Sequence, residues 1–389
     1  EAAAGLWCRR VNVVAGVGGF GAVTDTVLET AARSLITRGI PPEYRISMTY
    51  ASWRSPYFPD PRSFRQKTLD RLNEGCLLWV YVGHGRRQGL DWVRVPIGVA
   101  PILEVDDVDR VSSLQGLPIA VFLSCYSAAF DGPQDCLGER LLLQERGPVA
   151  VVGGSRVTMP YGMAVLATAL MKETFQQRRD TLGEILLQAK RQLGTAPASG
   201  RDSSWIDVLA RTLSPTAQQL QEERREHVLM FNLLGDPLLR IRHPLPLEVM
   251  APTSAEAGTP LAIECRAPIT GDVRVELVCQ RGHFTFRPQQ RSSFDASDAA
   301  MRSLNTVYER ANEDHYTQQS FRTGTSTFRT SLYVPEHVEG RCLVRVFLRN
   351  GESFALGAAS LRVDRRSVAN LSLIHISEPT RPVGISRMP

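Results

Sequence analysis

Short apolar segments that alternate with longer amphipathic ones constrain the fold of this 389-residue chain more than any other feature. Nearly continuous apolar runs suit the central strands of a parallel sheet that is covered on both faces. The intervening stretches carry apolar residues at three- and four-residue spacing, which indicates crossover helices. We therefore predict an α/β fold, a doubly wound, mostly parallel sheet with helices on both faces. The expected strands are residues 11–15, 46–50, 77–82, 119–123 and 149–152, and the expected helices are 24–37, 63–73, 105–114, 137–145, 163–175, 182–193 and 217–227.

The periodicity changes at Pro244 and Pro246, where the helical spacing ends. Short alternating segments separated by turn residues then predict an all-β sandwich of the immunoglobulin-like kind. We expect domains at residues 1–243 and 244–366, with residues 289–325 as a long loop or insertion in the sandwich. The expected sandwich strands are residues 261–266, 273–279, 328–334, 342–348 and 358–363.

The last segment, residues 371–389, does not continue this pattern. Its beginning, LSLIHISEPTR, resembles the conceptual translation of a sequencing adapter. We interpret the segment as an assembly artefact that packs against nothing. The natural protein is then expected to continue past about residue 370 and to begin before Glu1.

Composition excludes several classes of protein. The chain is 43% hydrophobic and 22% charged, which is typical of globular proteins and not of disordered ones. The net charge of +5 is spread along the sequence without a basic stripe, so nucleic acid is not expected as a partner. The apolar runs are far shorter than the roughly 20 residues of a membrane-spanning helix. Nothing in the sequence indicates an oligomeric state.

The chain has seven cysteines, with neither a C-x-x-C pair nor a zinc-type Cys/His spacing. No metal site is assigned from the sequence. Cys265, Cys279 and Cys342 lie in the C-terminal third, where an exported protein has room for one disulfide, and the sequence does not choose the pairing.

A histidine and a cysteine each follow an expected central strand. His84 lies between two glycines after residues 77–82, and Cys125 follows residues 119–123. Ligands and catalytic groups of open α/β sheets gather at the carboxyl ends of the strands. If these strands are neighbours, the imidazole can take the thiol proton and activate Cys125 as a nucleophile. The N–H groups of Gly85 and Cys125 are then available to a developing oxyanion.

Five motifs in order resemble the gingipain-like cysteine peptidases, which belong to the caspase-like group. They are YVGHG at residues 81–85, LSCYSAAFDG at 123–132, DCLGERLL at 135–142, GPVAVVGGSRVT at 147–158 and NLLGDPLLRIR at 232–242. The resemblance covers about residues 11–242, and the sandwich resembles the immunoglobulin-like domain that follows gingipain catalytic domains. It implies a caspase-like fold with His84 as the catalytic histidine, Cys125 as the nucleophile and Gly85 as an oxyanion donor.

The resemblance implies a bacterial cysteine endopeptidase that is secreted, at the cell surface or in the periplasm, and that acts on protein or peptide substrates through a thioester. It needs no organic cofactor. Gingipain-like enzymes often bind structural calcium, but no run has the spacing of an EF-hand loop, so calcium stays unassigned.

Further residues near the expected site have open roles. Asp25, in the first turn of the helix after residues 11–15, is a weak candidate to orient His84, since a capping role explains it equally well. Asp91, Trp92 and Asp131 follow the two catalytic strand ends and are candidates for the primary specificity pocket. Cys136 is expected to be a packing residue.

Two other functions compete with peptidase activity. Residues 16–21 read GVGGFG, a G-x-G-x-x-G between a strand and a helix, which is the setting of a dinucleotide site. Because Ser52 and Arg54, and no acid, follow the second strand, only an NADP-dependent oxidoreductase would fit, and it would leave His84 and Cys125 without a role. The second alternative is a catalytically inactive caspase-like binding or scaffold protein, against which the presence of both residues argues.

Overall fold

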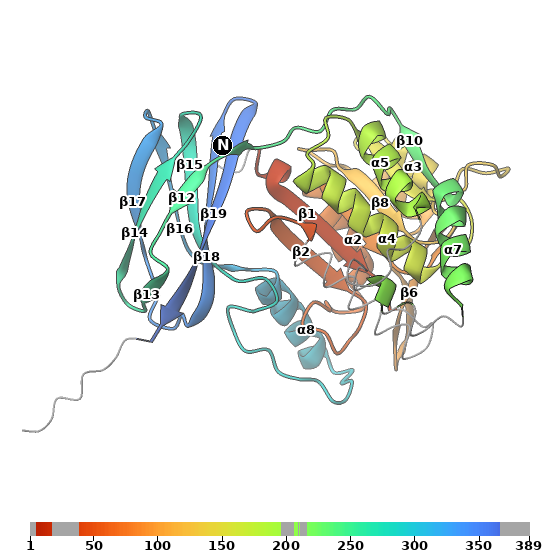
Figure 1. Ribbon diagram of the computed structural model, residues 1–389. Coiled ribbons are helices and arrows are strands. Elements are labelled where there is room, and N and C mark those ends of the chain that lie inside the picture. The colour runs from red at the N-terminus through yellow and green to blue at the C-terminus, as the bar shows by residue number, and fades with distance from the viewer. Residues whose placement is uncertain (1–4, 18–38, 196–205, 209, 211–215, 366–389) are drawn as a thin grey trace, which may run out of the picture.

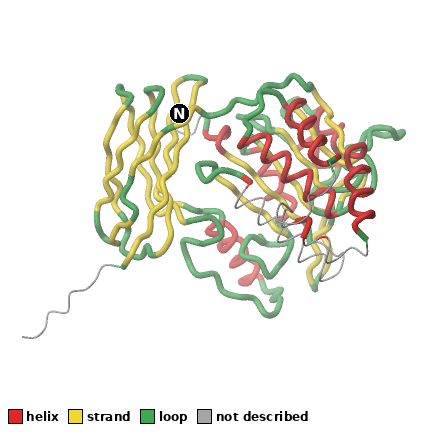
Figure 2. Tube along the Cα trace, in the orientation of Figure 1, coloured by secondary structure: helices red, strands yellow, loops and turns green. Residues whose placement is uncertain are grey.

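A computed structural model describes residues 5–17, 39–195, 206–208, 210 and 216–365. An α/β part and a β-sandwich lie side by side (Figure 1). Figure 2 shows the strands of the sandwich next to the helix-covered sheet of the α/β part. The expected helix at residues 24–37 and the segment 371–389 lie outside the described residues.

The α/β part is built on one sheet with the strand order β10-β9-β8-β3-β1-β2. All neighbouring strands are parallel except β10, which runs antiparallel to β9 at the edge. The five expected strands are present, with ends shifted by at most two residues. The strands are β1 (Arg10–Ala15), β2 (Arg45–Tyr50), β3 (Leu78–Val82), β8 (Ile119–Leu123), β9 (Ala150–Gly154) and β10 (Phe231–Gly235).

Both faces of this sheet are covered by helices, as predicted. In β3, Val80 packs with the core beneath α4 and α5, whereas Trp79 and Tyr81 pack with the core beneath α2 and α3. This alternation follows from the two-residue period of a strand. The helices are α2 (Phe64–Asn73), α3 (Leu137–Leu143), α4 (Pro160–Met171), α5 (Leu182–Gly194) and α7 (Ala217–Met230), and a π-helical turn (Lys172–Gln176) extends α4.

The predicted crossover helix at residues 105–114 is wrong. Only a 3₁₀ helix, Val105–Arg110, forms there, and β-hairpins occupy much of the connection between β3 and β8. Pro96 and Gly98, with a φ of 152° at Gly98, turn the chain back on itself before the segment begins. The hairpin strands are β4 (Gly85–Arg86), β5 (Gly89–Leu90), β6 (Trp92–Val95) and β7 (Gly98–Pro101).

The C-terminal part consists of two sheets around a separate apolar core. The larger sheet has the order β11-β19-β18-β15-β16, with β13 also paired to β19, and the smaller sheet has the order β12-β14-β17. The predicted β-sandwich is therefore present, although the same part of the chain also contains a helix and is not all-β. Its strands are β11 (Leu245–Pro246), β12 (Glu248–Met250), β13 (Ser254–Glu256), β14 (Pro260–Arg266), β15 (Gly271–Cys279), β16 (His315–Thr323), β17 (Thr327–Tyr333), β18 (Gly340–Asn350) and β19 (Ser353–Asp364).

Of the two possibilities expected for residues 289–325, a long loop is wrong, because the segment contains helix α8 (Asp298–Ala311) and strand β16, and α8 is inserted between β15 and β16. Met301 and Leu304 of α8 join the core of the α/β sheet, and the Tyr308 hydroxyl lies 2.8 Å from that of Thr49 in β2. Figure 1 shows α8 beside the α/β part. The helix thus connects the sandwich to the α/β part.

All seven cysteines lie in the described residues and are free thiols. Cys279 and Cys342 face each other across β15 and β18 and are not bonded. In the described part of the chain, no helix combines the length and apolar character that a membrane crossing needs.

Candidate active site

His84 and Cys125 follow neighbouring parallel strands at the same edge of the sheet. In the register of β3 and β8, Val82 pairs with Leu123, and each functional residue lies two positions beyond its paired strand end. The Gly83 N–H donates to the Leu123 carbonyl at 3.2 Å and extends this pairing toward the site. His84 and Cys125 therefore lie at the same level, just beyond the carboxyl edge of the sheet.

The turn that carries His84 is held by a buried tyrosine. The Tyr81 hydroxyl donates to the His84 carbonyl at 2.8 Å, and Tyr81 itself is fully buried. Gly83 has a φ of 154°, and a Cβ at this position would lie 2.7 Å from the Tyr81 oxygen. The turn therefore requires glycine at position 83, and the tyrosine fixes the backbone of the histidine.

Gly85 lies against the backbone of the cysteine loop. A Cβ at Gly85 would lie 2.5 Å from the Cys125 carbonyl oxygen and 2.7 Å from the Ser124 Oγ. These separations are shorter than real Cβ contacts, so only glycine permits the approach of the two loops. The close approach places the residues after His84 next to Cys125.

The Cys125 sulfur is half-buried and contacts the loop after β9. The Thr158 N–H donates to the sulfur at 3.3 Å. The next residue, Tyr126, has a φ of 54°, a conformation that a bulky side chain rarely adopts, and its N–H donates to the Arg156 carbonyl at 3.2 Å. Backbone strain of this kind is frequent at functional sites.

The other six cysteines are buried. Burial raises the pKa of the Cys136 thiol to about 11 and that of the Cys8 and Cys265 thiols to about 12. A thiolate is the reactive form of cysteine, so these buried groups are poor nucleophiles. Cys125 alone combines partial exposure with a position at the carboxyl ends of the strands.

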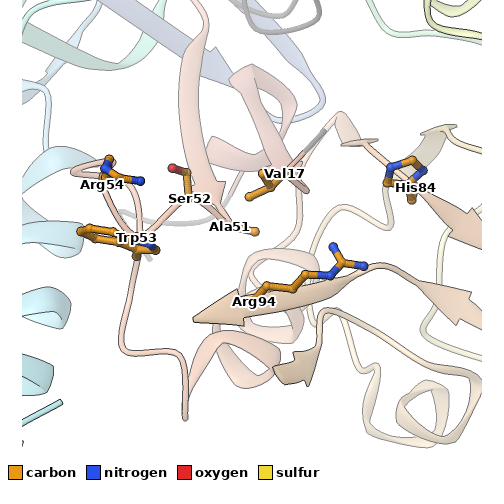
Figure 3. A pocket seen from close by; sticks show the side chains of 7 residues that line it. All are labelled: Val17, Ala51, Ser52, Trp53, Arg54, His84 and Arg94. Carbon is orange, nitrogen blue, oxygen red and sulfur yellow. The ribbon is translucent and has the colours of Figure 1, made fainter. Parts of the chain in front are cut away.

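A pocket of about 410 Å³ opens beside His84 (Figure 3). It lies where the strand order reverses, between the chain that leaves β1 and β2 and the chain that leaves β3. Open α/β sheets bind ligands at such switch points. The pocket is lined by Val17, Ala51, Ser52, Trp53, Arg54, His84 and Arg94.

None of the specificity residues proposed from the sequence lines this pocket. Asp131 is exposed and forms an ion pair with Arg156 at 2.6 Å. Asp91 is buried beneath Arg94, which donates two hydrogen bonds to its carboxylate. Trp92, on β6, stacks with the Arg86 guanidinium at 4.5 Å. Asp25 and residues 18–21 of the glycine-rich loop lie outside the described residues.

Glu313, Asp314 and His315 are grouped closely enough to hold a cation. Their charges already have partners, because Glu313 pairs with His315 and Arg45, and Asp314 pairs with Arg345 at 3.0 Å. Because its carboxylates are already neutralised by cationic side chains, the group does not fit a calcium site, and no calcium ligand is assigned.

The fold and the site together define an α/β protein with a thiol and an imidazole at one sheet edge. Residues 1–242 match the model of peptidase family C25, so the chain belongs to this family and is a cysteine-type peptidase. Comparison with curated proteins gives no match. Family membership does not favour the oxidoreductase or the inactive scaffold.

Solved structures that resemble this one have low sequence identity to it. The Arg-specific cysteine proteinase gingipain R is 14% identical, with a TM-score of 0.41 over 92% of this chain and 68% of its own. The complex of the pro- and mature domains of RgpB from Porphyromonas gingivalis is 12% identical, with a TM-score of 0.41 over 92% of this chain and 69% of its own.

Sequence reasoning missed Thr158 and Arg94 as site residues, and it considered Arg54 only for the competing dinucleotide site. Thr158 follows the end of β9, so the same strand-end rule that found His84 and Cys125 points to it. Arg94 lies on a hairpin that was not predicted, and no signal in the sequence placed it beside His84.

Proposed function

We propose that this peptidase is an endopeptidase in which Cys125 is the nucleophile and His84 the general acid and base. The observation that carries the proposal is the pairing of Val82 with Leu123, which brings both residues to one edge of the sheet. The close packing of Gly85 against the Cys125 carbonyl supports it. The Gly85 and Cys125 N–H groups supply the oxyanion site in this proposal.

In the proposed reaction, the Cys125 thiolate attacks the peptide carbonyl and a sulfur–carbon bond forms. The carbon–nitrogen bond then breaks, and His84 gives its proton to the leaving amine. Water next attacks the thioester while His84 takes its proton, and the Cys125 sulfur leaves as the carboxylic acid product forms. The residues start and finish in the same protonation states.

The broader setting is also part of the proposal. Membership of a peptidase family supports protein or peptide substrates. The order of the domains supports a catalytic part at residues 1–243 and a sandwich of the immunoglobulin-like kind at 244–366. Secretion or display at the bacterial surface is inferred from the family resemblance alone.

The rate of thiol alkylation as a function of pH tests the coupling of the two residues. We expect a thiol-directed peptidyl inhibitor to label Cys125 in the wild type at neutral pH. In His84→Ala, labelling at pH 7 should be about 10-fold slower or more, because a thiol without an imidazole partner is only a few per cent thiolate. Mass spectrometry of the labelled peptide identifies the site.

A matched control replaces His283, a histidine of the sandwich, by alanine. This variant should label like the wild type. Superimposable pH profiles for wild type and His84→Ala would show that the two residues are not coupled, and would favour the inactive scaffold.

Replacement of Gly85 by alanine is expected to lower kcat/KM by about 10²–10³-fold, the cost of one displaced oxyanion donor. The added Cβ would collide with the Cys125 carbonyl and push the two loops apart. Peptide hydrolysis and thermal unfolding should be measured together. The control is Gly324→Ala, because a Cβ there meets nothing within 4 Å. Unchanged activity in Gly85→Ala would contradict the assigned oxyanion site.

A further inference from the structure

The pocket beside His84 contains two guanidinium groups, and no acidic side chain is among the described residues that line it. Arg54 enters from the chain after β2, and Arg94 enters from β6. Figure 3 shows both with His84 around the same space. The charge of these groups indicates which substrate side chains the pocket accepts.

Arg54 presents a positive charge that has no acidic partner among the described residues. Its side chain is exposed, and its guanidinium lies 4.1 Å from the centre of the Trp53 ring. Stacking on an aromatic ring leaves the edge of a guanidinium, with its N–H donors, available to a ligand. Arg54 can therefore bind a carboxylate without first breaking an ion pair within the described part of the chain.

Arg94 is held in place by the buried carboxylate of Asp91. Its two terminal nitrogens donate to the Asp91 carboxylate at 3.2 and 3.0 Å. The Asp91 side chain is 2% exposed, whereas that of Arg94 is 55% exposed. A guanidinium has five N–H donors, so the bond to Asp91 leaves donors for a ligand. Asp91 thus positions an arginine and does not offer a carboxylate to the pocket.

The pocket is adjacent to the proposed site of bond cleavage. In the sheet order, Cys125 follows β8, His84 follows β3, and the rest of the pocket follows β1 and β2. Because His84 itself lines the pocket, a carbonyl held between Cys125 and His84 belongs to a substrate residue that lies beside it. A basic side chain in that position would meet the like charge of Arg54, whereas the charge of Arg94 is already paired with Asp91.

We infer that the pocket receives the side-chain carboxylate of Asp or Glu at the substrate residue whose carbonyl Cys125 attacks. This inference rests on the proposed function, since it assigns the specificity of the same site. Arg54 supplies a charge that no acidic group among the described residues compensates, and Arg94, positioned by Asp91, supplies further N–H donors.

The test measures kcat/KM for fluorogenic peptides that differ only at the residue before the cleaved bond. Wild type should prefer Asp or Glu over Arg or Lys by about 100-fold or more. Arg54→Gln should lower kcat/KM for the acidic peptides by about 10- to 100-fold, the effect of one charge-assisted hydrogen bond. It should leave peptides with Asn or Gln almost unchanged. Arg54→Glu should move the preference toward Arg and Lys.

Two controls are needed. One tells a side-chain carboxylate from the carboxylate at the peptide C-terminus, and the other tells the charge of Arg54 from that of a distant arginine. All peptides are made with amidated C-termini and again with free C-termini, because a terminal carboxylate has the same chemistry as a side-chain one. Preference only for the free termini would overturn the inference. Arg322→Gln, an exposed arginine of the sandwich, should change none of the rates.

Peptidyl inhibitors with Asp or Arg at the same position distinguish failure of the inference from failure of the proposed function. Labelling of Cys125 by the Asp inhibitor supports both. Labelling by the Arg inhibitor in preference overturns the inference and leaves the Cys125 nucleophile intact. Labelling by neither, with no peptide cleaved, overturns the proposed function and the inference with it.

Discussion

Replacement of Cys125 by alanine is expected to lower peptide hydrolysis by on the order of 10⁴-fold or more, because it removes the atom that forms the proposed thioester. The variant should fold like the wild type, since the Cys125 side chain is half-buried and contacts mainly Thr158. Hydrolysis of a peptide substrate and covalent labelling by a thiol-directed peptidyl inhibitor are the two measurements. Both should be lost together.

Cys136→Ala is the matched control for this prediction. Cys136 lies 11 positions later in the sequence, next to α3, and is fully buried. Its pKa is raised by burial to about 11, so it is not expected to react at neutral pH. This variant should keep both activities. Loss of hydrolysis in Cys136→Ala with retention in Cys125→Ala would transfer the nucleophile to Cys136.

The sequence was sufficient to predict the central sheet and the positions of two candidate catalytic residues. Strands such as β3 and β8 consist of uninterrupted apolar residues, a pattern set by burial on both faces. Because parallel strands share an edge, His84 and Cys125 could be placed together without knowledge of the loops. These predictions depend only on short-range patterns and one rule of topology.

The parts that were not predicted depend on contacts between distant segments. Met301, Leu304 and Tyr308 have helical spacing, but polar neighbours gave residues 289–325 the composition of a loop. The apolar face of α8 is buried by the α/β sheet, a contact that local pattern does not show. Arg94 reaches the pocket through a hairpin whose position depends on the same kind of tertiary packing.

Glu276→Gln is expected to reduce the free energy of unfolding by about 3–5 kcal/mol, the cost of breaking a buried ion pair by removing one partner. Glu276, on β15, accepts hydrogen bonds from Arg9 at 2.7 and 3.0 Å and from Arg345 at 2.8 Å. The side chains of all three are 2–3% exposed. Arg9 directly precedes β1, so the cluster joins the α/β part to the sandwich.

A matched control is Glu264→Gln, which removes the partner of Arg329 at 2.9 Å on the exposed side of β14. Exposed pairs of this kind contribute about 0–1 kcal/mol. In denaturant unfolding, Glu276→Gln should therefore lower the free energy of unfolding several-fold more than Glu264→Gln does. Equal and small losses would show that the buried cluster is not what holds the two parts together.

The pH dependence of the effect of Glu276→Gln gives a second, independent result. Burial raises the pKa of Glu276, but the guanidinium charges of Arg345 and Arg9 outweigh burial and hold the pKa well below its usual range. A carboxyl whose pKa is depressed on folding stabilises the protein above its unfolded pKa of about 4.3, and this contribution is lost as the pH falls toward the native pKa. The difference in unfolding free energy between wild type and Glu276→Gln should be constant from pH 8 to about pH 5 and should narrow below about pH 4.3. A difference that stays constant down to about pH 3 would mean that the pKa of Glu276 does not change on folding. That result would exclude the charge pairing of Glu276 as the cause of the difference in unfolding free energy.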